Sequence, residues 1–222
     1  MKTVFLALAA IIGCALAPAL AASWPEVVLP PDSRGELVSG HMKNNGLDMR
    51  VSRFDTPLSV DEIVEFYRGR WGDEHVVDQF DGKTIVGRAQ GKHYVTVELE
   101  PKGGATSGTI GIMKMPEGRI DYVLGEGFLQ PPGTEVFNDI RYYDTPRETR
   151  TIGMRNMQTP YANFEFYSLR LRARDWQREQ DEGSCQRIHA RCVANFSKGK
   201  EKIALTMTRA ADFSTVIVAN IE

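Results

Sequence analysis

Hydrophobic residues recur at helical spacing in one stretch near residue 60. They are Val60, Ile63, Val64, Tyr67 and Trp71. Side chains spaced three or four positions apart lie on one face of an α-helix, with the polar residues between them on the other face. Ser59 and Glu62 have the S-x-x-E spacing of a capping box, in which each side chain bonds the backbone N–H of the other residue. The pattern predicts an amphipathic helix that begins after Ser59 and lies on a sheet.

Segments on both sides of this helix alternate hydrophobic and polar residues, as half-buried strands do. Turn residues separate them, including Asn44-Asn45-Gly46 and Asp81-Gly82, which favour tight hairpins. The order is therefore strand, helix and then a meander of strands. The predicted strands are 37–41, 47–54, 75–80, 83–88, 94–99 and 109–113, with the glycine-rich residues 103–108 as a loop before the last one.

The pattern starts again about a hundred residues later, which is the signature of an internal repeat. Matching features are the proline pairs 30–31 and 131–132, the Thr-Pro pairs 56–57 and 159–160, the aromatic pairs 66–67 and 166–167, and the Gly-Lys pairs 91–92 and 199–200. We therefore expect a tandem duplication. Chance similarity between two strand-rich halves is the alternative.

These patterns predict an α+β fold of two tandem similar modules, each an antiparallel sheet with one packed helix. The first module is expected at 30–116 and the second at 131–222. Residues 117–130 form a connector between them. Within the connector, Ile120 to Leu124 is a candidate edge strand.

The second helix is less clear than the first. A helical stripe behind a candidate cap at Asn163 competes with strict alternation over 169–174, which favours a strand. The equivalent position in the first copy favours a helix, and a strand over 164–176 remains the alternative. The stripe consists of Ala162, Phe166, Leu169, Ala173 and Trp176.

A helix here would place Arg170, Arg174 and Arg178 at positions i, i+4 and i+8, in one exposed row. Such a row is a candidate contact for an anionic partner, because guanidinium groups bind carboxylate and phosphate with paired hydrogen bonds. An anionic lipid, an acidic glycan or an acidic protein patch would fit. The alternative is a solvated helix face, partly balanced by nearby acidic residues.

The first residues carry a targeting pattern. Lys2 precedes an apolar run over 4–16, and the small residues Ala19-Leu20-Ala21 follow. This predicts a secretory signal peptide at 1–21, cleaved near Ala21. The run is too short for a membrane span, so none is expected in the mature chain. Cys14 ends a sequence that resembles a lipobox, and a lipoprotein anchored through Cys14 is the alternative.

Cys185 and Cys192 are the two cysteines that follow the predicted leader. In an oxidising compartment they are expected to form a disulfide. They lack the spacing and the nearby histidines of a zinc site. The formal net charge of −2 gives no argument for a nucleic-acid partner.

The sequence offers no motif for catalysis or for a cofactor. The histidines His41, His75, His93 and His189 share no metal-ligand spacing, and no G-x-S-x-G sequence occurs. The glycine-rich segment 103–108 lacks the G-K-[ST] ending of a phosphate-binding loop. We therefore expect no enzyme activity and no cofactor.

These observations favour an exported, periplasmic protein of the cell envelope with a binding or assembly role and no catalysis. Its expected partner is another envelope protein, with an anionic lipid or glycan as the alternative. Two other functions stay open. One is an envelope hydrolase with a site between the modules. The other is a periplasmic inhibitor or immunity protein that inserts the loop 103–108 or the arginine row into a partner's cleft.

Overall fold

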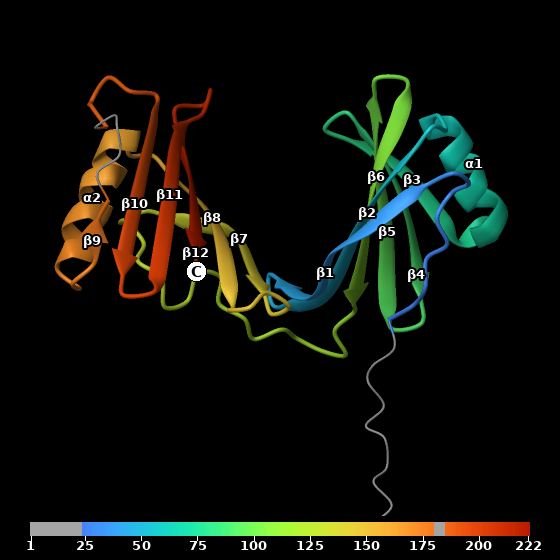
Figure 1. Ribbon diagram of the computed structural model, residues 1–222, viewed down its shortest axis with the longest axis horizontal. Helices are drawn as coiled ribbons and strands as arrows, with labels where there is room; N and C mark the ends of the chain where they lie inside the picture. The colour runs from blue at the N-terminus through green and yellow to red at the C-terminus, as the bar shows by residue number, and fades with distance from the viewer. Residues whose placement is uncertain (1–23, 180–184) are drawn as a thin grey trace, which may run out of the picture.

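The computed structural model describes residues 24–179 and 185–222. These residues form one antiparallel sheet of twelve strands with two α-helices and a short 3-10 helix (Figure 1). The predicted leader at 1–21, including Cys14, lies outside the described residues. The strands are β1 (Arg34–Asn44), β2 (Leu47–Thr56), β3 (His75–Phe80), β4 (Lys83–Gln90), β5 (His93–Lys102), β6 (Ala105–Lys114), β7 (Glu135–Tyr142), β8 (Thr149–Asn156), β9 (Gln177–Arg178), β10 (Arg191–Lys198), β11 (Glu201–Arg209) and β12 (Thr215–Ile221). The helices are α1 (Val60–Trp71), the 3-10 helix η1 (Gly72–Glu74) and α2 (Pro160–Arg172).

The prediction of an α+β fold was wrong. Strands make up 50% of the structure and helices 14%, so the chain is mostly antiparallel β-sheet. Strand length explains part of the error. In the predicted loop 103–108, only Gly103 and Gly104 take the positive φ of a turn, and the strand β6 already begins at Ala105. The strands β5 and β6 remain paired as far as Lys102 and Ala105. Most residues at these ends are polar, so hydrophobic alternation does not mark them as strand.

The two predicted modules are also joined more closely than expected. Strands β1 and β7 pair antiparallel, through Met42–Asn44 on one side and Ile140–Tyr142 on the other. This pairing makes one continuous sheet with the order β3-β4-β5-β6-β2-β1-β7-β8-β12-β11-β10-β9. Because this pairing joins residues about a hundred positions apart, no local pattern in the sequence predicts it.

The order of elements repeats from one half to the other. Each half runs strand, strand, helix and then four strands, and each is arranged in space in the same order from the outer edge to the join. In Figure 1 the sheet bends near the pairing of β1 with β7, so that the halves rise on both sides and α1 and α2 lie on the outer flanks. This arrangement agrees with the expected repeat, while the exact domain boundaries stay a prediction.

Equivalent side chains make equivalent hydrogen bonds in the two halves. The hydroxyl of Tyr67 donates to the carbonyl of Val28 (3.2 Å), and the hydroxyl of Tyr167 donates to the carbonyl of Leu129 (3.1 Å). Two further matched donors are Thr106, to the carbonyl of Leu58 (2.7 Å), and Thr215, to the carbonyl of Gln158 (2.6 Å). These pairs fix which residues correspond between the halves.

Helix α1 forms as predicted. The capping box is present, because Glu62 N–H donates to the Ser59 hydroxyl (3.4 Å) and Ser59 N–H donates to the Glu62 carboxylate (2.8 Å). Ile63, Val64 and Tyr67 are buried in the core of the first half. The sequence pattern therefore identified both the start of this helix and its buried face.

Helix α2 confirms the helical interpretation over the strand, but its predicted face was wrong. Thr159 caps the helix, and Asn163, the predicted cap, is buried and bonds Asn156. Leu169, which the predicted stripe places in the core, is 68% exposed, whereas Leu171 is 3% exposed. The sequence contains a second stripe at helical spacing, Phe164, Tyr167 and Leu171, and this stripe is the one that packs into the core.

The described segment 115–134 connects β6 to β7 and carries no helix or strand. The candidate edge strand at Ile120 to Leu124 does not form. The segment begins beside the first half, where Met115 N–H donates to the carbonyl of Lys92 (2.8 Å), and its later residues Phe128 and Leu129 pack against the core of the second half.

Candidate functional site

A pocket with a volume of about 330 Å³ opens in the second half, beside the end of α2. Three elements surround it: the sheet, the residues that follow α2 and the connector between the halves. Its lining combines arginines with aromatic and aliphatic side chains. The lining side chains include Phe128, Arg141, Arg150, Arg174, Trp176 and Ile221.

The floor of the pocket is a row of directly opposed residues on four neighbouring strands. Arg141 of β7 pairs with Arg150 of β8, Arg150 pairs with Ile221 of β12, and Ile221 pairs with Ile203 of β11. Neighbouring strands lie about 4.8 Å apart, so the row changes from cationic to aliphatic within a short distance.

The chain leaves α2 through a Schellman-type pair of hydrogen bonds. Trp176 N–H donates to the carbonyl of Leu171 (3.1 Å), and Asp175 N–H donates to the carbonyl of Arg172 (3.0 Å). Asp175 takes the positive φ (65°) that this motif requires. The motif turns the chain back over the helix end, so that Leu171, Arg174 and Trp176 all line the pocket.

Arg150 is held by a buried carboxylate on the same face of the sheet, that of Asp139 on the neighbouring strand. Its Nε and Nη2 donate to the two oxygens of Asp139 (2.8 and 2.6 Å), and the Gly125 N–H also donates to this carboxylate (2.8 Å). Burial by itself raises the pKa of Asp139, but these hydrogen bonds outweigh it and hold the pKa below its usual value. The charge of Arg150 is therefore compensated.

Arg141 also has an acidic partner. Its Nη1 donates to the carboxylate of Glu148 (2.9 Å), and its Nε donates to the hydroxyl of Tyr122 (3.4 Å). Burial alone would lower the pKa of Arg141, but these two partners raise it above its ordinary value. Arg141 and Glu148 thus present a neutral ion pair at one side of the pocket.

Arg174 differs from the other two arginines. Its side chain is exposed, and no acidic residue within the described ranges forms an ion pair with it. Its backbone is held in place, because Lys198 Nζ donates to the carbonyl of Arg174 (2.9 Å). Among the described residues, the guanidinium of Arg174 is therefore a pocket-lining cation without an ion-pair partner, which suits an anion.

The predicted row of three arginines does not form, because the turn at Asp175 ends the helical path. Arg170 lies in the last turn of α2, with its guanidinium 5.9 Å from the ring centroid of Phe166. Arg178 lies in β9, 5.3 Å from the ring centroid of Phe164. Of the three predicted residues, Arg174 alone lines the pocket.

Sequence reasoning missed Arg141 and Arg150. A signal was available in β8. Arg150, Ile152 and Met154 are spaced two positions apart, so all three lie on the core side of the strand. A charged residue at a core-facing strand position needs a buried partner or an opening to solvent. The structure provides both, because Arg150 binds Asp139 and lines the pocket.

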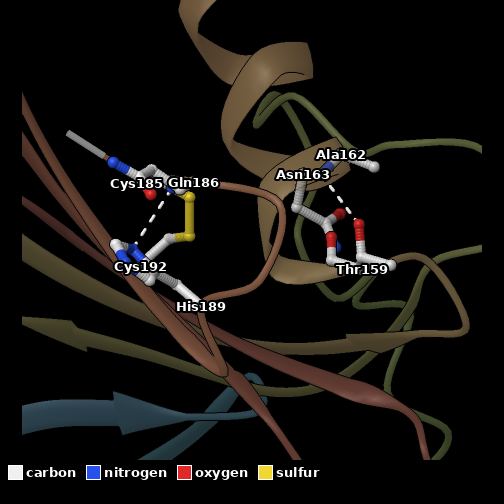
Figure 2. The surroundings of a disulfide bond; sticks show 7 residues. All are labelled: Thr159, Ala162, Asn163, Cys185, Gln186, His189 and Cys192. Atoms are coloured by element: carbon white, nitrogen blue, oxygen red, sulfur yellow. Dashed lines mark hydrogen bonds between the residues drawn. A yellow bond between two sulfur atoms is a disulfide. The ribbon is translucent and has the colours of Figure 1, made fainter.

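The predicted disulfide is present near the other end of α2. Cys185 and Cys192 are bonded, with their Cα atoms 5.1 Å apart, and both are buried in the core of the second half. Figure 2 shows the bond beside the first turn of the helix, where Ala162 N–H donates to the Thr159 hydroxyl (3.1 Å). The bond fixes the segment that enters β10. The disulfide lies near the first turn of α2, whereas the pocket lies beside the last turn.

A second hollow, of about 360 Å³, contains Asp48 and Glu117. Each carboxylate is paired with a lysine, Asp48 with Lys43 and Glu117 with Lys92. The hydrogen bond and charge of Lys92 lower the pKa of Glu117. A carboxyl group that stays ionised near neutral pH is a poor general acid, so this hollow is a weaker candidate.

Among residues 24–179 and 185–222, no group of three or more His, Cys, Asp or Glu side chains is arranged to hold a metal ion. No helix in the same residues is long and apolar enough to cross a membrane. None of the family models, curated proteins or solved structures compared with the chain matches it.

Proposed function

We propose that this chain is an exported protein of the cell envelope that binds an anionic ligand in the pocket beside α2, without catalysing a reaction. The observation that carries this proposal is the exposed guanidinium of Arg174, which has no ion-pair partner among the described residues and lines a pocket with aromatic and aliphatic side chains. Ligand sites commonly have volumes of about 300–1,000 Å³ and a few polar groups among apolar ones. The volume of about 330 Å³ lies within that range.

Export is supported by two features of the chain. The leader pattern at 1–21 is typical of a secretory signal, and the Cys185–Cys192 bond suits an oxidising compartment. The mature protein is then periplasmic or secreted. Lipid attachment at Cys14 is the alternative, and the mass of the mature protein from its native membrane fraction distinguishes the two.

Binding is favoured over hydrolysis by the state of the nearby carboxylates. Asp139, which lies in the strand that joins the halves, is fully buried and already accepts bonds from Arg150 and Gly125. Glu148 is engaged by Arg141. Carboxylates held in this way are poorly suited to exchange protons with a substrate, which weakens the proposal of a hydrolytic site between the halves.

Thermal unfolding of the purified mature protein tests the binding proposal, because a ligand that binds the folded state raises the Tm. Anionic and cationic amphiphiles with equal chains, decanoate and decyltrimethylammonium, are compared on the wild type, Arg174→Gln and Arg170→Gln. We expect decanoate to raise the Tm of the wild type and of Arg170→Gln, and to lose most of this effect in Arg174→Gln. An equal response of all three proteins, or a stronger response to the cation, contradicts the proposal.

A second candidate function is assembly with another envelope protein by strand addition at β3. This strand is one outer edge of the sheet, and its Val76, Val77 and Phe80 are 59%, 40% and 70% exposed. An exposed apolar edge can pair with an extended strand of a partner. A photo-crosslinker at Gln79 should then capture one defined partner in cells, whereas the same group at Asp61 of α1 should not. Equal capture from both positions, or from neither, contradicts strand addition.

A further inference from the structure

We infer that the ligand of the arginine pocket is an amphiphile, with one anionic head group on a short hydrocarbon chain. This inference rests on the proposed binding function and adds the chemical class of the ligand. The head group would pair with Arg174 at the exposed rim. The chain would lie on the aliphatic part of the floor, against Ile203, Ile221 and Trp176.

In the first half of the protein, a tryptophan packs against the core at the position that corresponds to Leu171. Leu171 corresponds to Trp71, as the matched tyrosines Tyr67 and Tyr167 four residues earlier establish. The ring of Trp71 lies 4.6 Å from the ring of Tyr67, centroid to centroid, and 5.5 Å from the guanidinium carbon of Arg88. The first half therefore covers this part of its core with its own indole ring.

The floors beneath the two positions also correspond. Ile112 pairs with Val95 in the first half, and Ile221 pairs with Ile203 in the second. Trp71 packs against the core that contains the first pair, whereas the second pair lines the open pocket. Leu171 is smaller than Trp71, and a pocket remains beside it that Leu171 and Trp176 both line, so the apolar body of a ligand can pack here against the core.

The charge at the rim distinguishes the halves as well. Three residues beyond Trp71 the chain has Glu74, and three residues beyond Leu171 it has Arg174. Both side chains are exposed. The second half thus combines an open apolar floor with a cation at its rim, and this combination selects an anionic head over a neutral or cationic one.

Two kinds of molecule carry such a head, a fatty carboxylate and a phosphorylated alkyl or lipid fragment. Calorimetric titrations with decanoate and decyl phosphate distinguish them, at concentrations below micelle formation. Acetate and inorganic phosphate supply the head groups alone, and decanol supplies the chain alone. We expect at least one decyl anion to bind the wild type about tenfold more tightly than its head group, because only it buries apolar surface.

Three variants test the two parts of the site separately. Arg174→Gln should weaken binding of the decyl anion about fivefold, the scale of one exposed ion pair, while Arg170→Gln should stay close to the wild type. Leu171→Trp should fill the pocket as Trp71 fills the first half and abolish binding. If this variant unfolds, Trp176→Ala replaces it, and removal of this pocket wall should weaken binding of the chain without an effect on acetate.

The outcomes separate the inference from the function on which it rests. If acetate or inorganic phosphate binds as tightly as the decyl anions, and Arg174→Gln removes that binding, the proposed anion-binding function stands and the amphiphile inference is overturned. If decanol binds as tightly as the decyl anions, or if no anion binds, both are overturned. If Arg174→Gln binds every anion as the wild type does, both are likewise overturned.

Discussion

Arg150 and Asp139 form a two-point ion pair, in which Nε and Nη2 of the guanidinium each donate to a separate carboxylate oxygen. Asp139 also connects the halves through its backbone. Its N–H donates to the side-chain oxygen of Asn45 (2.8 Å), and its carbonyl accepts from the Asn45 N–H (2.9 Å). This pair therefore stabilises the join and fixes one side of the pocket at the same time.

The first prediction concerns the loss of this ion pair. Asp139→Asn leaves the guanidinium of Arg150 without its countercharge in a mostly buried position, and removal of one partner of such a pair typically costs about 3–5 kcal/mol. We expect a loss of about 3 kcal/mol in the free energy of unfolding, measured by urea denaturation. Asp121→Asn, in the exposed pair with Arg119, is the control and should leave stability unchanged. Equal effects of the two variants would contradict a structural role for Asp139.

The second prediction concerns pH. Because the folded-state pKa of Asp139 lies below its unfolded value, the ionised carboxylate stabilises the fold above the unfolded pKa of about 3.9. This contribution is lost as the pH falls from there through the folded-state pKa. The wild type should therefore lose stability on acidification more steeply than Asp139→Asn, measured by urea unfolding at stepped pH. Parallel pH profiles would assign the acid sensitivity to other groups.

The third prediction concerns the disulfide. The Cys185–Cys192 bond closes a short loop, for which chain entropy gives a stabilisation of about 2–3 kcal/mol. The double variant Cys185→Ser, Cys192→Ser should unfold at a correspondingly lower urea concentration. Its affinity for decanoate should match that of the wild type, because the bond lies near the first turn of α2 and the pocket lies at the last. A loss of affinity in the folded variant would show that the two regions are coupled.

The fourth prediction separates the observed face of α2 from the face that its sequence favours. Leu171→Ala should cost about 3 kcal/mol, because it removes a buried side chain. Leu169→Ala should have little effect, because Leu169 is mostly exposed. Unfolding curves of both variants provide the measurement. If Leu169→Ala were the more destabilising variant, the result would support the predicted stripe that contains Leu169.

Local patterns in the sequence identified the local features of this protein. Ser59 and Glu62 marked the start of α1, and the Asn45-Gly46 turn does connect β1 to β2, with both residues at positive φ. The repeated aromatic pairs correctly pointed to two halves with the same order of elements. Each of these depends on residues that are close in sequence or on a comparison of the sequence with itself.

The features that were missed depend on contacts between distant residues. The β1–β7 pairing joins positions near 43 and 141, and hydrophobic alternation carries no information about which strands become neighbours. The turn at Asp175 broke the arginine row, because an aspartate took the left-handed conformation that usually calls for glycine. The pocket depends on both kinds of contact, so Arg174 was found from the sequence while its neighbours were not.

The most direct test of the binding pocket uses the three tryptophans, each with one indole N–H resonance in a two-dimensional ¹H–¹⁵N spectrum. Trp24 and Trp71 pack in the first half, and Trp176 lines the pocket in the second. Titration with decanoate or decyl phosphate should shift the Trp176 resonance, assigned with Trp176→Phe, to saturation, and should leave the other two in place. A titration in which Trp176 does not move, or in which all three move together, would contradict a specific site beside α2.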